Sequence, residues 1–524
     1  MKFDRVIKDG MIVDGTRQPR FIGDIGIRDG RIVEMGKIDD AGSAEVIDAS
    51  GMIVAPGFVD LHTHYDAQLF WDPYCSLSGW HGVTSAVIGN CGFGFAPMLP
   101  ENRDRAMLSM TRIEAIPYES MRLGLPWSWV SYPEFLDAVD ATPKAINILP
   151  YVPAGPLLIW VMGLEGAKSG RMPTDEEHAQ LRRVFAEALD AGGCGWSAQR
   201  TPPSGGAAVQ RDYDGTPMVT DLMHDETAFE LCKVLRERNE GFMQVLYESG
   251  DQPTNELFYE RLAEISGRPV LMNVVTPLPD KPSYHRNQLA WLKRCHERGL
   301  RVIGQGNTSD AGYTFTMEDW NLFDDLDVWA EVTTGTREER KAKMADPARR
   351  QALRDNIPNG LIPLHRVVVT GPRLEKHKQW LDHDIGLIAE KTGRHVVDIF
   401  LDMAVEEDLK TEFFGLPPMT SIPLLKEIVD DPSVVFGVSD GGAHTRFLTS
   451  GRFPTEHIIK IVREHKMCSL EEMHWRLSTL PALVAGFRDR GTLVPGAPAD
   501  IVVYDLENLT IHDVEVAHDF PGNE

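Results

Sequence analysis

Short apolar runs alternate with amphipathic stretches along the middle of the chain, between residues 56 and 484. The amphipathic stretches have helical periodicity. The one at 174–191, for example, begins with a capping box at Thr174 and ends at two glycines. Strands that alternate with helices in this way form parallel sheets covered by the helices. Eight strands are predicted, one just before His62 and the others at 83–88, 145–151, 195–198, 241–248, 269–275, 301–305 and 434–439. Eight such units predict an α/β fold, the (β/α)8 TIM barrel.

The two ends of the chain carry a different pattern. Short alternating runs at 6–10, 24–27 and 31–34 are separated by Asp-Gly pairs, which are typical of tight turns between strands. A matching turn and strand lie at 490–505. We therefore predict a small β-sandwich domain formed by 1–55 together with 485–524, and a barrel domain at 56–484.

The interval from about residue 306 to 433 is too long for one crossover between neighbouring strands. Its periodic stretches at 337–356, 379–392 and 396–407 indicate helices. We predict an insertion over the C-terminal face of the barrel, where the active sites of barrel enzymes lie.

Charge and composition narrow the range of possible binding partners. The formal net charge is −25 and the isoelectric point is about 5.1, which argues against nucleic acid or an anionic membrane as a partner. The N-terminus has no apolar signal core, and no run of about 18 apolar residues occurs. Six scattered cysteines without paired spacing suit a reducing compartment. We expect a cytoplasmic protein, and a homo-oligomer is compatible with this composition.

Candidate chemistry lies where the predicted strands end. His62 and His64 are two residues apart, so they project from one side of a strand, and imidazole pairs of this kind bind metals. Cys91 follows the second strand and Asp440 follows the eighth, each beside glycines that allow a tight turn. Each residue also has a plainer interpretation: a strand cap, a buried thiol or an acid that turns the chain. His444, just beyond Asp440, either contacts substrate or is merely solvated.

Several motifs together resemble a known family. The stretch Val54-Ala55-Pro56-Gly57-Phe58-Val59-Asp60-Leu61-His62-Thr63-His64 resembles the strand-one signature of the amidohydrolase superfamily, and Pro495-Gly496-Ala497-Pro498-Ala499-Asp500-Ile501-Val502-Val503 matches its end. Four further motifs resemble the D-aminoacylase branch, the N-acyl-D-amino-acid deacylases: Gly89-Asn90-Cys91-Gly92, Ser439-Asp440-Gly441 with His444, Arg452-Phe453-Pro454 and Leu480-Pro481-Ala482. The resemblance implies a zinc-dependent hydrolase that cleaves non-peptide amide bonds.

The resemblance also implies a set of metal ligands, and this chain lacks part of it. In that branch one or two zinc ions lie among the strand-one histidines, the strand-two cysteine, the strand-eight aspartate and one histidine each from strands five and six. Here strands five and six carry Gln244 and Asn273 instead. We therefore expect one zinc ion, or another divalent metal ion, on His62 and His64. Asp440 is expected to be a ligand or the general base for metal-activated water, and Cys91 a further ligand.

Other polar residues are candidates for substrate binding. Gln244 and Asn273 can donate neutral hydrogen bonds to the substrate or to an oxyanion. Arg200 and Arg446 can pair with a substrate carboxylate, and His444 can contact the substrate. Together with the tryptophans near residues 71 and 80, these residues predict a small-molecule substrate with a carboxylate and an apolar or aromatic group.

Three alternative functions stay open at the level of the sequence. The same site could hydrolyse a lactone or a cyclic amide. The missing strand-five and strand-six histidines favour a metal-dependent lyase or decarboxylase on the same barrel, because the fold does not fix the reaction. The third alternative is a non-catalytic binding protein.

Overall fold

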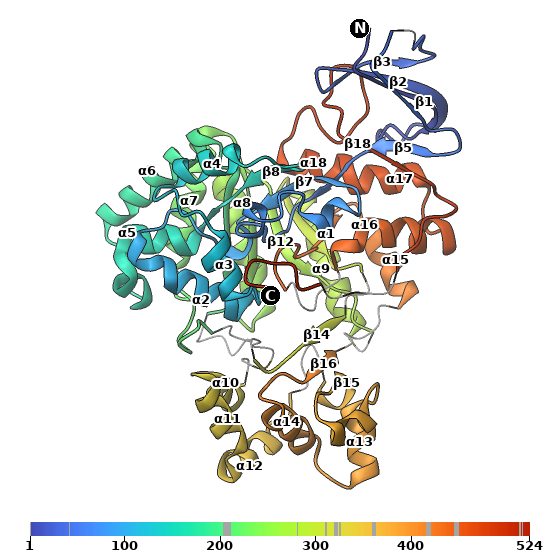
Figure 1. The fold of residues 1–524 in the computed structure, drawn as a ribbon. Helices are drawn as coiled ribbons and strands as arrows, with labels where there is room; N and C mark the ends of the chain where they lie inside the picture. Colours follow the sequence, from blue (N-terminus) through green and yellow to red (C-terminus); the bar gives the residue numbers. More distant parts are fainter. Residues whose placement is uncertain are drawn as a thin grey trace.

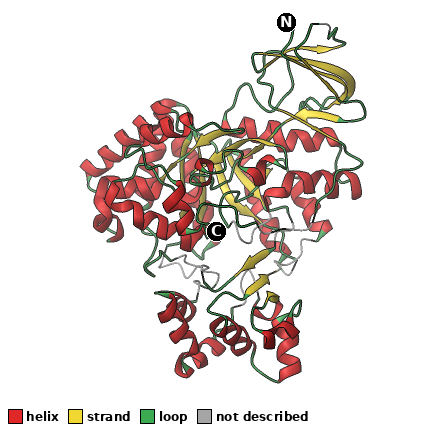
Figure 2. Cartoon of the chain, in the orientation of Figure 1, coloured by secondary structure: helices red, strands yellow, loops and turns green. Residues whose placement is uncertain are grey.

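The computed structural model describes the chain except residues 1, 41, 203–210, 280, 310–311, 319–322, 324–325, 359–362, 416–420, 445–449, 513–514 and 516. Its centre is a barrel of parallel strands surrounded by helices (Figures 1 and 2). A small sheet lies at one end of the barrel, and a separate lobe lies at the other (Figure 1).

The barrel strands pair in the order of the sequence. They are β6 (Phe58–Asp60), β7 (Val83–Ile88), β8 (Asn147–Pro150), β9 (Val152–Pro153), β10 (Gly195–Arg200), β11 (Phe242–Tyr247), β12 (Val270–Val275), β13 (Val302–Gly306) and β17 (Val434–Phe436). Only Tyr151 separates β8 from β9, so the two make up the single third strand of the prediction. A parallel bridge between Thr63 and Gly441 joins the first strand to the last. The predicted (β/α)8 barrel is confirmed.

Helices cover the outside of the barrel (Figure 2). They are α1 (Ser76–Gly79), α2 (Arg103–Glu114), α3 (Tyr118–Gly124), α4 (Tyr132–Ala141), α5 (Ala154–Lys168), α6 (Asp175–Ala191), α7 (Asp225–Arg238), α8 (Gln252–Ser266), α9 (Pro282–Glu297), α15 (Ile422–Asp430), α16 (Phe453–Glu456), α17 (Leu470–His474) and α18 (Leu480–Ala485). In α6 the predicted capping box between Thr174 and Glu177 is present. Within the described part of the chain, no helix has both the length and the apolar character needed to cross a membrane.

Both ends of the chain contribute to the small sheet. Its strands are β1 (Arg5–Ile12), β2 (Phe21–Arg28), β3 (Arg31–Gly36), β4 (Glu45–Asp48), β5 (Ile53–Pro56) and β18 (Ile501–Tyr504). The order is β18-β5-β1-β2-β3, with β4 paired to β1.

Beyond Tyr504 the chain leaves this sheet and returns to the barrel. There Phe520 contacts Trp71 with ring centroids 5.8 Å apart, and Ser120 donates a hydrogen bond of 2.9 Å to the Pro521 carbonyl. Residues Phe520 and Pro521 therefore contact the barrel, and the assignment of 485–524 to the small domain stays a prediction.

The insertion between β13 and β17 forms the lobe at the lower end of Figure 1. Its elements are β14 (Tyr313–Phe315), α10 (Asp327–Thr333), α11 (Arg337–Ala345), α12 (Pro347–Asp355), β15 (Val368–Gly371), α13 (Ile385–Thr392), α14 (Val396–Glu406) and β16 (Glu412–Gly415). Because the lobe follows the C-terminal end of β13, it lies on the barrel face that carries the site. It also holds the end of α2: Ala115 packs in the lobe's apolar core, and Arg112 Nη1 donates to the Thr333 carbonyl at 3.1 Å.

Candidate metal centre

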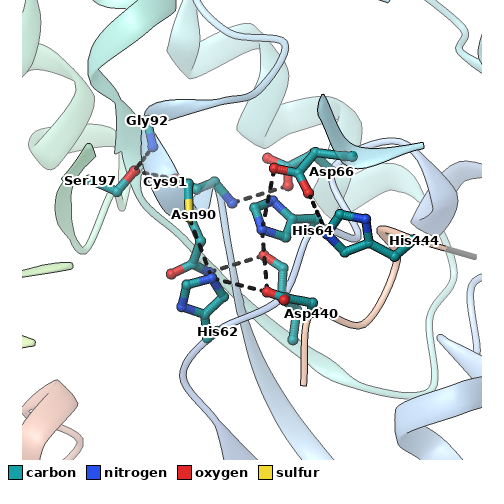
Figure 3. Close-up of polar contacts among 12 residues, drawn as sticks. His62, His64, Asp66, Asn90, Cys91, Gly92, Ser197, Asp440 and His444 are labelled. Atoms are coloured by element: carbon teal, nitrogen blue, oxygen red, sulfur yellow. Dashed lines mark hydrogen bonds and ion pairs between the residues drawn. The ribbon is translucent and has the colours of Figure 1, made fainter. Parts of the chain in front are cut away.

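The two histidines after β6 lie at the mouth of the barrel beside Cys91 and Asp440 (Figure 3), and both are almost completely buried. The backbone carbonyl of His62 accepts a hydrogen bond from Asp440 N at 3.2 Å, and His64 N donates to the Gly441 carbonyl at 2.7 Å. Thr63 points the other way, and its hydroxyl donates to the Val87 carbonyl at 2.8 Å. The pairing of the first and eighth strands therefore holds both imidazoles beside Asp440.

The four predicted ligands converge. His62 Nε2 lies 3.2 Å from Asp440 Oδ1 and 3.5 Å from Cys91 Sγ, and His64 Nε2 lies 3.7 Å from Asp440 Oδ1. Donor atoms of His62, His64 and Cys91 all lie within 4.8 Å of one another. Two ligands of one zinc ion, each bound at about 2.0–2.3 Å, are about 3 to 4 Å apart. The spacing and the chemistry of the donors therefore fit a divalent metal ion.

The turn after β7 fixes the direction of the Cys91 thiol. Cys91 has a left-handed backbone with φ of 59°. Its N–H donates to Gln244 Oε1 at 2.7 Å, and the N–H of Gly92 donates to Ser197 Oγ at 2.9 Å. Asn90 Nδ2 donates hydrogen bonds to the carbonyls of Thr63 and Val87, which hold the turn in place. Burial raises the pKa of the Cys91 thiol, although the neighbouring His62 opposes this shift.

The electrostatics favour an ionised Asp440 carboxylate between a neutral His64 and His62, whose pKa is raised, against the effect of burial, by Cys91 and Asp440. Burial alone would raise the pKa of Asp440, but its hydrogen bond with His62 and the nearby His444 and His64 hold that pKa below its usual value. Burial lowers the pKa of His64 to about 3, so its Nε2 keeps the lone pair that a metal ligand needs. About a quarter of the Asp440 side chain, 24%, is exposed, so this carboxylate is within reach of a substrate.

Glu114, the last residue of α2, belongs to the same cluster and was not predicted. Its Oε1 lies 3.8 Å from His64 Nε2, and its Oε2 lies 3.2 Å from His444 Nε2. The Glu114 carbonyl accepts a hydrogen bond from His444 N at 2.6 Å. Burial raises the pKa of this carboxyl to about 8. The signal that could have revealed it is an acid inside the apolar run 113–117.

Three neutral amides line the barrel on the neighbouring strands β11, β12 and β13, two of them in place of the missing histidines. Gln244 on β11 is fully buried, and the structure describes no hydrogen-bond partner for its Nε2. Asn273 on β12 is paired in register with Gln305 on β13, so their side chains share a face. Gln305, which sequence reasoning missed, places its Oε1 3.3 Å from His62 Nδ1. Asn273 Oδ1 and Gln305 Nε2 are also buried and unpartnered in the described part of the chain. Such groups suit a polar ligand in the barrel mouth.

Arg200 lies on the other face of its strand. Ser197 of β10 faces the Cys91 turn, and Arg200 is three residues further along, so it points to the surrounding helices. Its guanidinium pairs with Asp225 at 2.8 Å and stacks over the rings of Tyr247 and Phe258 at 5.0 and 4.9 Å. The predicted contact of Arg200 with a substrate carboxylate stays a prediction, and this placement does not favour it. The predicted residue Arg446 lies outside the described residues.

We expect Arg200→Met to destabilise the fold without changing the chemistry. The variant loses a half-buried ion pair and cation–π contacts, and we expect it to lose about 2 kcal/mol of unfolding free energy. Denaturant unfolding measures this loss, and turnover per folded molecule should stay within about twofold of the wild type. A large rise in KM with unchanged stability would instead assign Arg200 to substrate binding.

Comparison with known proteins agrees with this fold. A family model described as the amidohydrolase family matches residues 45–148 and 366–519. N-acyl-D-glutamate deacylase of Alcaligenes xylosoxydans xylosoxydans is 33% identical over 516 residues, covering 97% of this chain and 88% of the relative. N-acyl-D-aspartate deacylase of the same organism is 27% identical over 520 residues, with 97% and 86% covered. A solved N-acyl-D-glutamate deacylase from Bordetella bronchiseptica, complexed with zinc and a phosphonate inhibitor, has a TM-score of 0.66 at 24% identity, with 98% of this chain and 92% of that chain covered.

The chain therefore belongs to the amidohydrolase family. Within that family the D-aminoacylase branch predicted from the motifs is confirmed, and the protein is a hydrolase of the metal-dependent, amide-cleaving class.

Proposed function

We propose that this protein is a zinc-dependent deacylase that releases D-amino acids from their N-acyl derivatives. The observation that carries the proposal is the convergence of His62, His64, Cys91 and Asp440 at the C-terminal end of the barrel. The D configuration of the substrate is proposed from the relatives, which are named for N-acyl-D-glutamate and N-acyl-D-aspartate.

The proposed metal ion is zinc, and we propose that the protein binds it at a single site. His62 Nε2, His64 Nε2 and Asp440 would hold it, with Cys91 as a further sulfur ligand. The ion would supply Lewis-acid activation of water and of the scissile carbonyl. One ion is proposed rather than two because neutral amides, Gln244 and Asn273, stand where the branch has the remaining histidines.

Asp440 is the proposed general base. Its carboxylate is ionised and partly exposed, and it contacts both imidazoles. In this position it can take the proton of the attacking water and return it to the leaving nitrogen. The Gln244, Asn273 and Gln305 amides on the neighbouring strands can donate hydrogen bonds to the oxygen that becomes negative during the reaction.

An apolar pocket beside the metal centre is proposed to hold an apolar part of the substrate. Its lining includes Gly92, which follows Cys91 in the sequence, and Ile113, which precedes Glu114. Most of its lining is apolar: Phe93, Met98, Ala106, Met110, Pro156, Ile159, Met218 and Val219. Trp80, expected from the sequence to line such a pocket, has 82% of its surface exposed.

We expect the variant Ala106→Leu to change substrate preference. Because the added side chain occupies pocket volume, kcat/KM for substrates with a bulky apolar group should fall about tenfold or more. Substrates that are small at that end, such as N-acetyl compounds, should change less than about threefold and serve as the internal control. Equal losses for large and small substrates would show that this pocket does not receive the substrate.

A panel of N-acyl amino acids tests the proposed activity. Zinc-loaded enzyme is incubated with N-acetyl derivatives of D- and L-amino acids, and the free amino acid is measured. The panel includes amino acids with acidic and with apolar side chains. We expect release of the free amino acid from the D substrates but not from the L substrates. No release from any compound by fully metal-loaded enzyme would contradict the deacylase proposal.

A further inference from the structure

Glu114 has no counterpart in the ligand set that the family resemblance implies, yet it lies within the metal centre. It comes from the end of α2, not from a strand end. The helix stops there because Ala115 adopts a left-handed backbone with φ of 48°. Packing of Ala115 into the insertion lobe and the hydrogen bond from Arg112 to Thr333 hold this helix end in place.

The carboxylate of Glu114 bridges two imidazoles. Oε1 lies 3.8 Å from His64 Nε2, within the range of about 3 to 4 Å expected for two ligands of one zinc ion. Oε2 lies 3.2 Å from His444 Nε2. Metal-bound carboxylates are usually held by a hydrogen bond on their second oxygen. His444 is placed to provide one.

If Glu114 is ionised, a carboxylate buried at this position needs a positive partner. Glu114 is 4% exposed, and Asp440 lies near the same imidazole. In the part of the chain that the structure describes, every ion pair of Glu114 and Asp440 involves histidine, and none involves Lys or Arg. His64 Nδ1 is also buried without a described partner. A divalent cation beside His64 Nε2 would compensate these charges, because buried charges are paired or bind metals.

We propose that Glu114 is a ligand of the metal ion held by His62, His64 and Asp440, and that His444 positions it through the second oxygen. In this arrangement a carboxylate from α2 replaces the lost donors of strands five and six, so the ion lies on the α2 side of the barrel mouth. The inference rests on the proposed metal site and adds a ligand to it.

The test compares metal affinity in wild-type protein, Glu114→Gln and Asp66→Asn. Asp66 is the matched control because it is a buried acid near the same centre, and its described hydrogen bond is to Gly89 N at 3.1 Å. Metal-free protein is titrated with Zn²⁺ against a chromophoric chelator, and the visible spectrum of the Co²⁺ form is recorded. We expect the Kd for Zn²⁺ to rise about 10- to 100-fold in Glu114→Gln, with a changed Co²⁺ spectrum. In Asp66→Asn the rise should be at most about threefold, and the spectrum should be unchanged.

Equal affinity and an identical Co²⁺ spectrum in Glu114→Gln would overturn the assignment, as would an equal loss in both variants. If circular dichroism shows that Glu114→Gln does not fold, a crystal structure of the zinc-loaded wild-type protein tests the assignment instead. An anomalous zinc peak about 2.0–2.2 Å from a Glu114 oxygen is expected. A peak bound by His62, His64 and Asp440 but clear of Glu114 would overturn this inference alone, whereas no zinc binding by the wild type would remove the proposed metal site as well.

Discussion

Replacing Asp440 by asparagine is expected to lower kcat at least about 1,000-fold at saturating zinc, while the fold stays intact. General acid–base catalysis contributes about 10²- to 10⁴-fold, and Asp440 performs two proton transfers in the proposed reaction. Asparagine keeps the size of the side chain and an oxygen that can face His62, but it cannot accept a proton. Steady-state kinetics at several zinc concentrations measure the loss.

The zinc dependence of this variant separates the role of Asp440 as a general base from its role as a metal ligand. If the residue acts mainly as a base, added zinc will not restore turnover, although the metal still binds. Asp24→Asn is the control for loss of a buried carboxylate, since Asp24 is buried in the small sheet, where it pairs with Lys8 at 2.8 Å. The control should lose stability but keep its turnover per folded molecule. Wild-type turnover in Asp440→Asn would refute the general-base assignment.

Removal of the metal is expected to abolish activity to below about 1% of the starting rate, and zinc should restore it. The protein's own donors hold the ion, so His64→Ala should leave a folded protein that no longer retains zinc. Because an ion that binds only the folded state stabilises it, added zinc should raise the melting temperature of the wild type but not of His64→Ala.

A matched histidine variant controls for loss of a buried imidazole. His474 is fully buried, donates or accepts a hydrogen bond with Tyr504 Oη at 2.8 Å and lies outside the cluster. His474→Asn should therefore keep the zinc-dependent rise in melting temperature. Activity that survives complete metal removal would show that the reaction does not use the ion.

The barrel was predictable because its signals are local. Strand β7 spans the predicted residues, since an apolar run between turn residues specifies a buried strand on its own. The eighth strand was predicted to reach residue 439, but it ends at Phe436. Gly437 turns into the left-handed region with φ of 92°, and Asp440 follows with φ of 50°. The departure from strand geometry is what brings Asp440 back against His62.

The parts of the site that depend on distant packing were harder to predict. Glu114 lies at a helix end, and only the fold brings that end to His64. Gln305 faces His62 because of strand register, which a single sequence does not reveal. The placement of Arg200, by contrast, was available from simple alternation, because residues three apart on a strand point to opposite faces.

In the proposed function, one metal ion held by His62, His64 and their neighbours drives amide hydrolysis. The most direct measurement is a titration of metal-free protein with zinc in which bound metal and the initial rate of amino-acid release are followed together. We predict that the rate rises in proportion to bound zinc and reaches its plateau at one equivalent per chain. A plateau that requires two equivalents, or a rate that does not depend on zinc, would contradict a reaction driven by a single zinc ion.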